Sequence, residues 1–263
     1  MPLVSIIMNC HNGERYLSES IRSIISQIYK NWELVFFDNN SNDNSSKIIK
    51  SFNDTRIKFY YSKKKLKLYN ARNQAITKAK GKYITFLDTD DLWNKNKLKK
   101  QVAIINRNRF IKVLYSNFYV YDQKKKIKFV KHKSKLPSGN ISHNLIKNYR
   151  VGILTLLLKK KIFEKYKFNT SFNIIGDFDL IMRLSLKYKI YVIQEPLATY
   201  RIHYNNFSSE RYDIYCEELK RWINLNKKRF YKLGLSLNPI KFFLFKLKIK
   251  NLIKFFFNIS SGV

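Results

Sequence analysis

The first half of the chain alternates short apolar runs with segments whose apolar residues recur at helical spacing. The runs are rich in β-branched and aromatic residues and predict strands at 3–8, 33–37, 57–61 and 82–87. The intervening segments predict helices at 17–28, 45–52 and 70–80. This alternation is typical of right-handed β-α-β crossovers, so we expect an α/β fold with a mostly parallel sheet and helices on both faces.

The second half of the chain is less regular. Its pattern predicts helices at 92–107 and 177–187 and strands at 113–121, 127–130, 151–158 and 190–193. The strands 113–121 and 127–130 flank a polar turn, so we expect them to pair antiparallel. From residue 212 the composition changes to a strongly charged segment and then a Phe- and Lys-rich one. We therefore predict one domain at 1–210, divided into 1–110 and 111–210, followed by a basic helical tail at 211–263.

Polar side chains follow three of the predicted strands. The clusters are 9–12 (Asn-Cys-His-Asn), 38–40 (Asp-Asn-Asn) and 88–91 (Asp-Thr-Asp-Asp). In open α/β sheets, ligands bind beyond the carboxyl ends of the strands. The three clusters are therefore expected to form one site.

The third cluster places three carboxylates, Asp88, Asp90 and Asp91, within four residues directly after an apolar strand. Burying unpaired carboxylates is costly, so such a cluster needs a cation. Oxygen ligands suit Mg²⁺ or Mn²⁺, which proteins usually hold through one or two carboxylates plus substrate phosphates. We predict Asp88 and Asp90 as metal ligands. The alternative is an acidic turn in which Asp91 caps the next helix.

The chain is strongly basic, with 52 Lys and Arg against 18 Asp and Glu, a net charge of +34. Such a surface attracts polyanions, either nucleic acid or an anionic membrane leaflet. No nucleic-acid-binding motif surrounds the scattered lysine runs. In the tail, lysines fall on two sides of the predicted helix, so both a membrane-surface segment and a helix packed on the domain remain open. Cys10 and Cys216 lie far apart, which favours a reduced, cytosolic setting.

Taken together, the motifs resemble glycosyltransferase family 2, a family of inverting enzymes with the GT-A (Rossmann-like) fold. The matching segments are 4–17, 26–34, 38–45, 71–73, 81–93 and 177–180. The resemblance is dense over 3–110, looser over 150–208 and absent from the tail. Gly176-Asp177 stands where the family usually has Glu-Asp.

The resemblance implies transfer of a sugar from a UDP- or dTDP-sugar to a hydroxyl of a glycan or lipid-linked acceptor. Residues 1–110 would bind the nucleotide-sugar, and 111–210 would supply the acceptor site and the catalytic base. The resemblance assigns the base to Asp177, with Asp179 as the alternative, and Mn²⁺ or Mg²⁺ to Asp88 and Asp90. It assigns nucleotide or diphosphate contacts to Asn9, His11, Asn12, Asp38, Arg72, Asp88 and His203. For Arg72 the alternative is that it buttresses Asp88.

Two other function classes fit parts of the pattern. A nucleic-acid-binding α/β protein would use the positive charge, but carboxylates at the ligand edge would repel a phosphate backbone. A metal-dependent nucleotidyltransferase would also use Asp-x-Asp, but it typically has a basic, Gly-rich phosphate loop after the first strand, which segment 9–14 lacks. We therefore expect a cytoplasmic glycosyltransferase, with peripheral contact to the inner face of an anionic membrane and no nucleic-acid partner.

Overall fold

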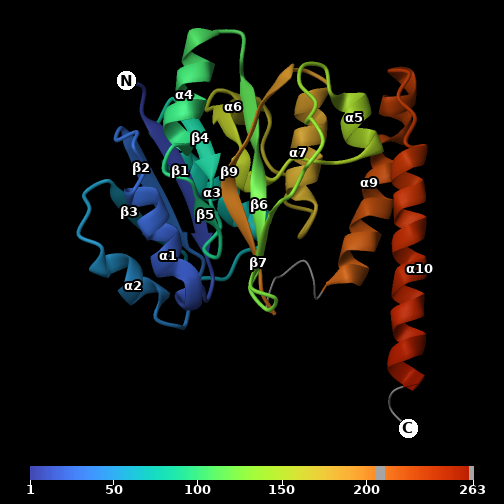
Figure 1. Ribbon diagram of the computed structural model, residues 1–263, viewed down its shortest axis with the longest axis horizontal. Coiled ribbons are helices and arrows are strands. Elements are labelled where there is room, and N and C mark those ends of the chain that lie inside the picture. Colours follow the sequence, from blue (N-terminus) through green and yellow to red (C-terminus); the bar gives the residue numbers. More distant parts are fainter. Residues whose placement is uncertain (205–210, 261–263) are drawn as a thin grey trace.

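The computed structural model describes residues 1–204 and 211–260, with side chains as far as residue 249. Its strands are β1 (Val4–Cys10), β2 (Trp32–Asp38), β3 (Ile57–Tyr61), β4 (Tyr83–Phe86), β5 (Leu92–Trp93), β6 (Val113–Asp122), β7 (Ile127–Val130), β8 (Leu157–Lys159) and β9 (Ile190–Ile202). Its helices are α1 (Glu14–Ile25), α2 (Ser45–Ser51), α3 (Leu68–Lys78), α4 (Lys97–Arg107), α5 (Ser142–Lys147), the 3₁₀ helix η1 (Ile153–Thr155), α6 (Ile162–Lys165), α7 (Gly176–Ser185), α9 (Tyr212–Lys232) and α10 (Asn238–Ser260). Figure 1 shows their arrangement.

A single mixed sheet runs through the molecule in the order β3-β2-β1-β4-β8-β6-β9-β5, with β7 paired to β6. The strands β1 to β4 pair parallel, as predicted, and Cys10 pairs with Asp38 in register. The ends of β1 and β2 therefore lie side by side. In the second half, β6 and β9 are parallel, whereas β8 pairs antiparallel with both β4 and β6. The predicted antiparallel pair is confirmed as β6 and β7.

Helices cover both faces of the sheet, as predicted, because residues along each strand alternate between two apolar clusters. Ile6 and Met8 of β1 belong to the cluster formed with α1, α2 and α4. Ile7, between them, belongs to the cluster formed with α3, α5, α6 and α7. Period-2 alternation of this kind is what a strand buried on both sides requires.

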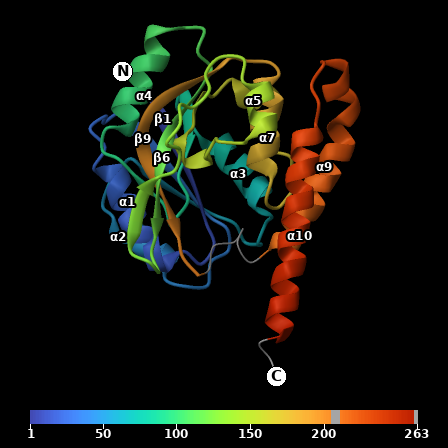
Figure 2. The same ribbon diagram turned by 45° about the vertical axis from the view of Figure 1, so that its right-hand side comes forward.

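The two C-terminal helices pack against the second cluster. Trp222 and Phe230 of α9 and Ile240 and Leu244 of α10 are buried in it. Both views show this helix pair on the side of the domain that carries α5 and α7 (Figures 1 and 2). The predicted boundary between the domain and the tail adjoins 205–210, which lie outside the described residues. Among the helices described, none has the length and apolar character needed to cross a membrane.

Two predicted elements are wrong in part. The helix predicted from residue 92 begins at Lys97, and the preceding Leu92-Trp93 pair with β9 instead, where the Trp93 indole donates to the Leu154 carbonyl at 2.9 Å. Asn96 occupies the N-cap position of this helix, without a side-chain capping bond, so the alternative of Asp91 as its cap is also wrong. The strand predicted over 151–158 is a short η1 turn followed by β8. The helix predicted at 177–187 is confirmed as α7.

Candidate active site

A cleft of about 360 Å³ opens where β4 ends. Its walls come from α3, α7, β6 and β9 and from the loop that follows β4. The charged or hydroxyl-bearing lining residues from α3, that loop and α7 are Tyr69, Arg72, Asp88, Asp90, Asp91 and Asp177. Side chains more than 80 residues apart in sequence therefore meet at the carboxyl end of a parallel strand, but of the three predicted strand-end clusters only the one after β4 lines this cleft.

Arg72 anchors one side of the cleft. Its side chain is 4% exposed, and its guanidinium donates to Asp88 Oδ1 at 2.6 Å. Asp88 is more open, with 37% of its side chain exposed. A buried guanidinium beside an accessible carboxylate fixes the direction in which Asp88 points. The structure thus places Arg72 against Asp88, the second of the two positions that the resemblance implies for it.

The segment that follows β4 is tied to the end of β9. His203 Nε2 lies 3.0 Å from Asp90 Oδ2. Arg201 donates from Nε to the Asp90 carbonyl at 2.9 Å and from its backbone amide to Asp91 Oδ1 at 3.0 Å. Its guanidinium also pairs with Glu19 of α1 at 2.6 Å. The acidic loop is therefore held by β9, which explains how His203 reaches Asp90 across more than 100 residues of sequence.

Asp91 is the buried member of the acidic triplet, 1% exposed. Burial, followed by the neighbouring carboxylates of Asp90 and Asp88, raises its pKa well above the usual aspartate range. The Ser20 hydroxyl of α1 contacts the backbone carbonyls of Thr89 and Asp91, both at 2.7 Å. Asp91 therefore supports the loop, and Asp88 and Asp90 are its two accessible carboxylates.

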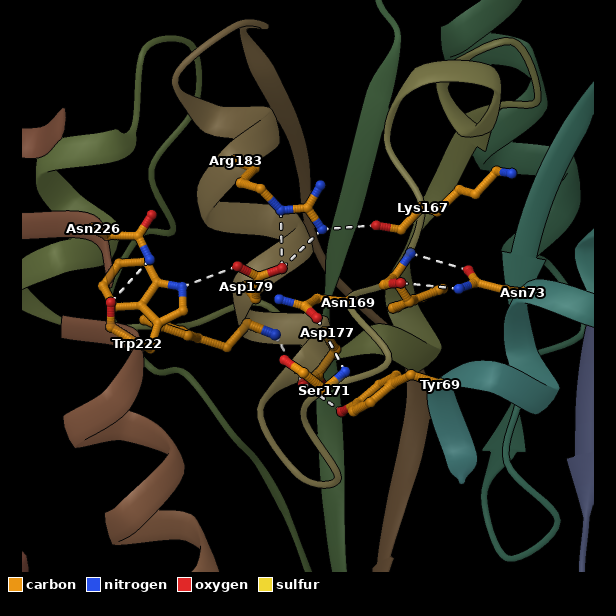
Figure 3. A network of polar contacts seen from close by, with 12 residues as sticks. Tyr69, Asn73, Lys167, Asn169, Ser171, Asp177, Asp179, Arg183, Trp222 and Asn226 are labelled. Atoms are coloured by element: carbon orange, nitrogen blue, oxygen red, sulfur yellow. Dashed lines mark hydrogen bonds and ion pairs between the residues drawn. The ribbon is translucent and has the colours of Figure 1, made fainter. Parts of the chain in front are cut away.

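Asp177 lies in the first turn of α7, on the wall of the cleft opposite Asp88 and Asp90. Its Oδ1 accepts a hydrogen bond from the Phe178 amide at 2.8 Å and lies 3.3 Å from the Tyr69 hydroxyl (Figure 3). That hydroxyl donates to the Ile174 carbonyl at 2.6 Å. Burial raises the pKa of the Asp177 carboxyl, and the nearby Arg72 guanidinium acts in the opposite direction. A carboxyl with a raised pKa is suited to accept a proton.

Asp179, the alternative base, lies away from the cleft. It is 3% exposed, pairs with Arg183 at 2.8 Å and accepts from the Trp222 indole at 3.0 Å (Figure 3). Successive helix positions two residues apart point to different faces, so only one of the two aspartates can reach the cleft. The geometry favours Asp177.

The predicted nucleotide residues of β1 and β2 do not line this cleft. Asp38 is fully buried, and its carboxylate accepts from the Ser41 amide at 2.9 Å and from the Ser46 hydroxyl. His11 Nδ1 lies 3.1 Å from the Asn39 carbonyl, and Asn12 Oδ1 accepts from the Asn42 amide at 3.0 Å. These contacts organise the loops at the ends of the two strands.

These loops nevertheless touch the acidic segment. A Cβ added to Gly13 would come within 2.9 Å of Thr89 Oγ1, so the absence of a side chain lets the two loops approach. Asn9, at the end of β1, has both amide atoms shielded from solvent, with no hydrogen-bond partner among the described residues. Buried polar atoms without partners are rare in folded proteins, so an ordered water or a ligand is expected to satisfy them.

Among the described residues, no three His, Cys, Asp or Glu side chains gather in a way that could enclose a metal ion. Asp88 and Asp90 instead offer carboxylate oxygens at the open side of the cleft. Two carboxylates with room for further oxygen ligands match how Mg²⁺ is held beside substrate phosphates. The donor set fits a divalent ion that shares its ligands with a diphosphate.

Several site residues were missed by sequence reasoning. Tyr69, Arg201 and Glu19 contact or brace the predicted residues, and Lys131 brings a second positive charge to the cleft. Arg201 lies two residues before the predicted His203, so the period-2 alternation of a strand could have placed both on one face. Tyr69 and Lys131 carry no comparable signal.

The family model for glycosyl transferase family 2 matches residues 5–185 of this chain. The chain belongs to glycosyltransferase family 2. It is therefore a glycosyltransferase, and the nucleic-acid-binding and nucleotidyltransferase interpretations are set aside. The match ends at the last residue of α7 and leaves α9 and α10 outside it.

Curated relatives of this glycosyltransferase come from several bacteria. UDP-Glc:alpha-D-GlcNAc-diphosphoundecaprenol beta-1,3-glucosyltransferase WfgD of Escherichia coli is 36% identical over 167 residues, 63% of this chain and 64% of WfgD. The match thus spans less than two thirds of WfgD. The putative teichuronic acid biosynthesis glycosyltransferase TuaG of Bacillus subtilis is 30% identical over 217 residues, 80% of this chain and 83% of TuaG.

Solved structures confirm the GT-A fold. S. aureus TarS 1-349 in complex with UDP-GlcNAc superposes with a TM-score of 0.66 at 18% identity, covering 85% of this chain and 67% of that one. The mannosyltransferase PcManGT from Pyrobaculum calidifontis, in complex with GDP-Man and Mn²⁺, gives a TM-score of 0.62 at 15% identity, covering 85% and 64%. At such low identities the similarity establishes the fold alone.

Proposed function

We propose that this glycosyltransferase moves a sugar from a UDP-sugar to a hydroxyl of a polysaccharide or lipid-linked acceptor, with inversion at the anomeric carbon and with a divalent metal. The observation that carries the proposal is the shared cleft. Asp88 and Asp90 lie on one wall and Asp177 on another, with the Arg72 guanidinium beside Asp88. This arrangement separates a place for the leaving diphosphate from a place for the attacking hydroxyl.

Asp88 and Asp90 would hold Mn²⁺ or Mg²⁺ together with the diphosphate, which fits their oxygen-only donor set. Such an ion, when bound, offsets the negative charge that the leaving diphosphate gains. His203, beside Asp90, and Arg72, paired with Asp88, orient these two carboxylates. Arg72 and Lys131 add positive charge near the diphosphate.

The uracil would lie near the ends of β1 and β2, where Asn9, His11, Asn12 and Asp38 gather. Asn9 supports this best, because its amide can both donate to and accept from a base edge and has no described protein partner. Asp38 is engaged by loop groups, so it would act mainly by shaping the pocket. Thymine offers the same edge, so a dTDP-sugar is the second donor class.

Asp177 would take the proton from the acceptor hydroxyl as that oxygen bonds to the anomeric carbon. The sugar–phosphate bond breaks on the opposite face, and the electron pair leaves with the diphosphate. A positioned general base contributes about 10²- to 10⁴-fold to such a step. The raised pKa of Asp177 supports this role, since it makes the carboxylate a better proton acceptor near neutral pH.

The acceptor class is supported by the two relatives, whose names assign a lipid-linked acceptor to WfgD and teichuronic acid biosynthesis to TuaG. An acceptor of this kind would bring the enzyme to a membrane. Phe242, Phe243 and Phe245 of α10 are 59%, 47% and 59% exposed, and Lys246 packs over the Phe242 ring at 4.5 Å. Exposed aromatic rings among lysines suit an anionic lipid surface, so we place the protein at the inner face of the cell membrane.

The proposal is tested by a donor screen. UDP release from UDP- and dTDP-sugars is measured with Mn²⁺, with Mg²⁺ and with EDTA, for the wild type and for Asp90→Asn. We expect metal-dependent release with a UDP-sugar and a loss of about 100-fold or more in the variant. Equal release with EDTA, or by the Asp90→Asn variant, would reject the metal assignment.

A further inference from the structure

Helix α9 lies outside the segment matched by the family, yet it contacts the loop that leads to Asp177. Three side chains at helical spacing, Glu218, Arg221 and Trp222, face this loop. Residues three and four apart share one face of a helix, so the three form a single contact surface. The loop and the first turn of α7 that it touches span residues 171–179.

Glu218 binds the backbone directly before Asp177. It is 6% exposed, and its Oε1 accepts from the Asn173 amide at 2.5 Å and from the Asn173 side chain at 3.1 Å. Its Oε2 accepts from the amides of Ile174 and Ile175 at 2.9 and 3.2 Å. One buried carboxylate therefore fixes three consecutive amides. Hydrogen bonds to an ionised acceptor are about twice as strong as neutral ones.

Trp222 and Arg221 hold the two ends of the same segment. The Trp222 indole, fully buried, donates to Asp179 at 3.0 Å, and its ring packs edge-on against Phe178 with centroids 4.9 Å apart. Arg221 donates to the Ser171 carbonyl at 2.7 Å. Figure 3 shows Trp222 reaching Asp179 from one side, with Asp177 turned toward Tyr69 on the other. The segment that carries Asp177 is thus held between α9 and Tyr69 of α3.

We infer that Glu218 and Trp222 are positioning residues that hold Asp177 in the geometry needed for proton transfer. The inference rests on the proposed function, in which Asp177 is the base. Neither side chain lines the cleft, so each acts through the 171–179 segment. Asn173 and Ile174, which Glu218 binds, line the cleft themselves, so the clamp also shapes the wall beside the base.

The test uses Glu218→Gln, which keeps the side-chain shape but sets an amide N–H₂ against backbone N–H donors. Turnover is followed as UDP release from the donor found in the screen, and the affinity and number of UDP sites are measured by calorimetry. We expect kcat to fall about tenfold or more, because small displacements of reacting groups cost up to ~100-fold. The KM for the donor and the number of UDP sites per chain should stay at wild-type values.

Two control variants come from the same helix. Lys220→Gln alters an exposed position, and Asn226→Ala removes an intrahelical bond to the Trp222 carbonyl. Both should keep wild-type kcat. Trp222→Phe keeps the ring contact with Phe178 but loses the bond to Asp179, and we expect it to lower kcat in the same direction. If Glu218→Gln does not fold, Trp222→Phe is the variant that tests the inference.

A double-mutant cycle separates positioning from general stability. On an Asp177→Asn background, Glu218→Gln should lower the residual UDP release by less than about twofold, since the group it positions is gone. A full, additive loss there, or wild-type kcat in Glu218→Gln, overturns the inference. If Asp177→Asn itself keeps wild-type turnover, the proposed role of Asp177 fails instead, so the two failures are distinguishable.

Discussion

The Tyr69 ring lies against Gly176 so closely that a Cβ at position 176 would come within 2.4 Å of the ring. The same ring carries the hydroxyl that donates to the Ile174 carbonyl and approaches Asp177. The family's usual glutamate at this position would therefore require the Tyr69 ring to move. In this chain, the carboxylate that binds the loop before Asp177 comes from Glu218 of α9.

Gly176→Ala should damage both stability and turnover. The added methyl must displace the Tyr69 ring, and overpacking of this kind costs about 1–3 kcal/mol. Chemical denaturation measures the loss of unfolding free energy. In the double variant with Tyr69→Ala the ring is gone, so the combined loss should be smaller than the sum of the single ones. Additive losses would contradict the packing relationship.

Arg72→Met should move the pH dependence of UDP release. Arg72 lowers the pKa of Asp177, so its removal raises that pKa further. A base works when deprotonated, so the acidic limb of the rate profile should shift to higher pH. Arg72→Lys keeps the charge and should shift the limb less, although it loses the guanidinium N–H that donates to Asp88 Oδ1. An unshifted limb in Arg72→Met would argue against Asp177 as the titrating group.

Lys97 should make the stability of the protein depend on pH. Its amine is fully buried, donates to Thr85 at 3.0 Å and Gln101 at 2.7 Å, and lies 4.1 Å from the centre of the Trp93 ring. Burial lowers its pKa well below the usual lysine value. Between the folded and unfolded pKa values, only the unfolded chain binds this proton, so unfolding free energy rises with pH.

Lys97→Met removes this contribution. The unfolding free energy of the wild type minus that of the variant should therefore rise by up to about 1.4 kcal/mol per pH unit between the folded-state and unfolded-state pKa values of Lys97. Denaturant titrations at several alkaline pH values measure it. Lys99→Met, at an exposed position on the same helix, is the control and should leave the slope unchanged. The same pH dependence of unfolding free energy in the wild type and in Lys97→Met would contradict the buried-amine account.

The exposed rings of α10 predict binding to anionic membranes. Replacing Phe242, Phe243 and Phe245 by Ser should lower the affinity for phosphatidylserine vesicles, measured by co-sedimentation, by about tenfold or more. The reason is that burying each ring in the membrane contributes about 1.5–3 kcal/mol. Phe110, 73% exposed in the connection between α4 and β6, provides a control as Phe110→Ser. Binding should also fall with salt and with vesicles of neutral lipid. Undiminished binding of the triple variant would exclude α10 as the contact.

The first half of the fold could be predicted because each of its strands and helices is specified by a short run of neighbouring residues. Each of β1 to β4 is a short apolar run, polar clusters follow β1, β2 and β4, and parallel pairing aligns the ends of these strands. The element at Leu92-Trp93 could not be predicted, since its strand geometry comes from pairing with Ala198 and Thr199, far along the chain. The apolar residues after it recur at helical spacing, and this pattern continues back to Leu92, so the sequence predicts a helix that begins too early.

The location of Asp88 and Asp90 in the cleft was predictable because both belong to one short motif at the end of a strand. The clamp from α9 was not, because it depends on packing between distant segments. One signal was present: Glu218 stands directly before the apolar Leu219 and four residues before Trp222, on the same helix face as Trp222. A charge on the buried face of a helix needs partners, and these proved to be the amides before Asp177.

The central claim is that Asp177 activates the attacking oxygen across the cleft from the metal-binding carboxylates. Its most direct test is hydrolysis of a UDP-α-sugar, followed by proton NMR, for the wild type and Asp177→Asn. We predict that the β-anomer of the sugar appears first, and that Asp177→Asn lowers the rate about 100-fold or more while binding UDP with unchanged affinity. Initial release of the α-anomer, or wild-type hydrolysis by Asp177→Asn, would contradict the account.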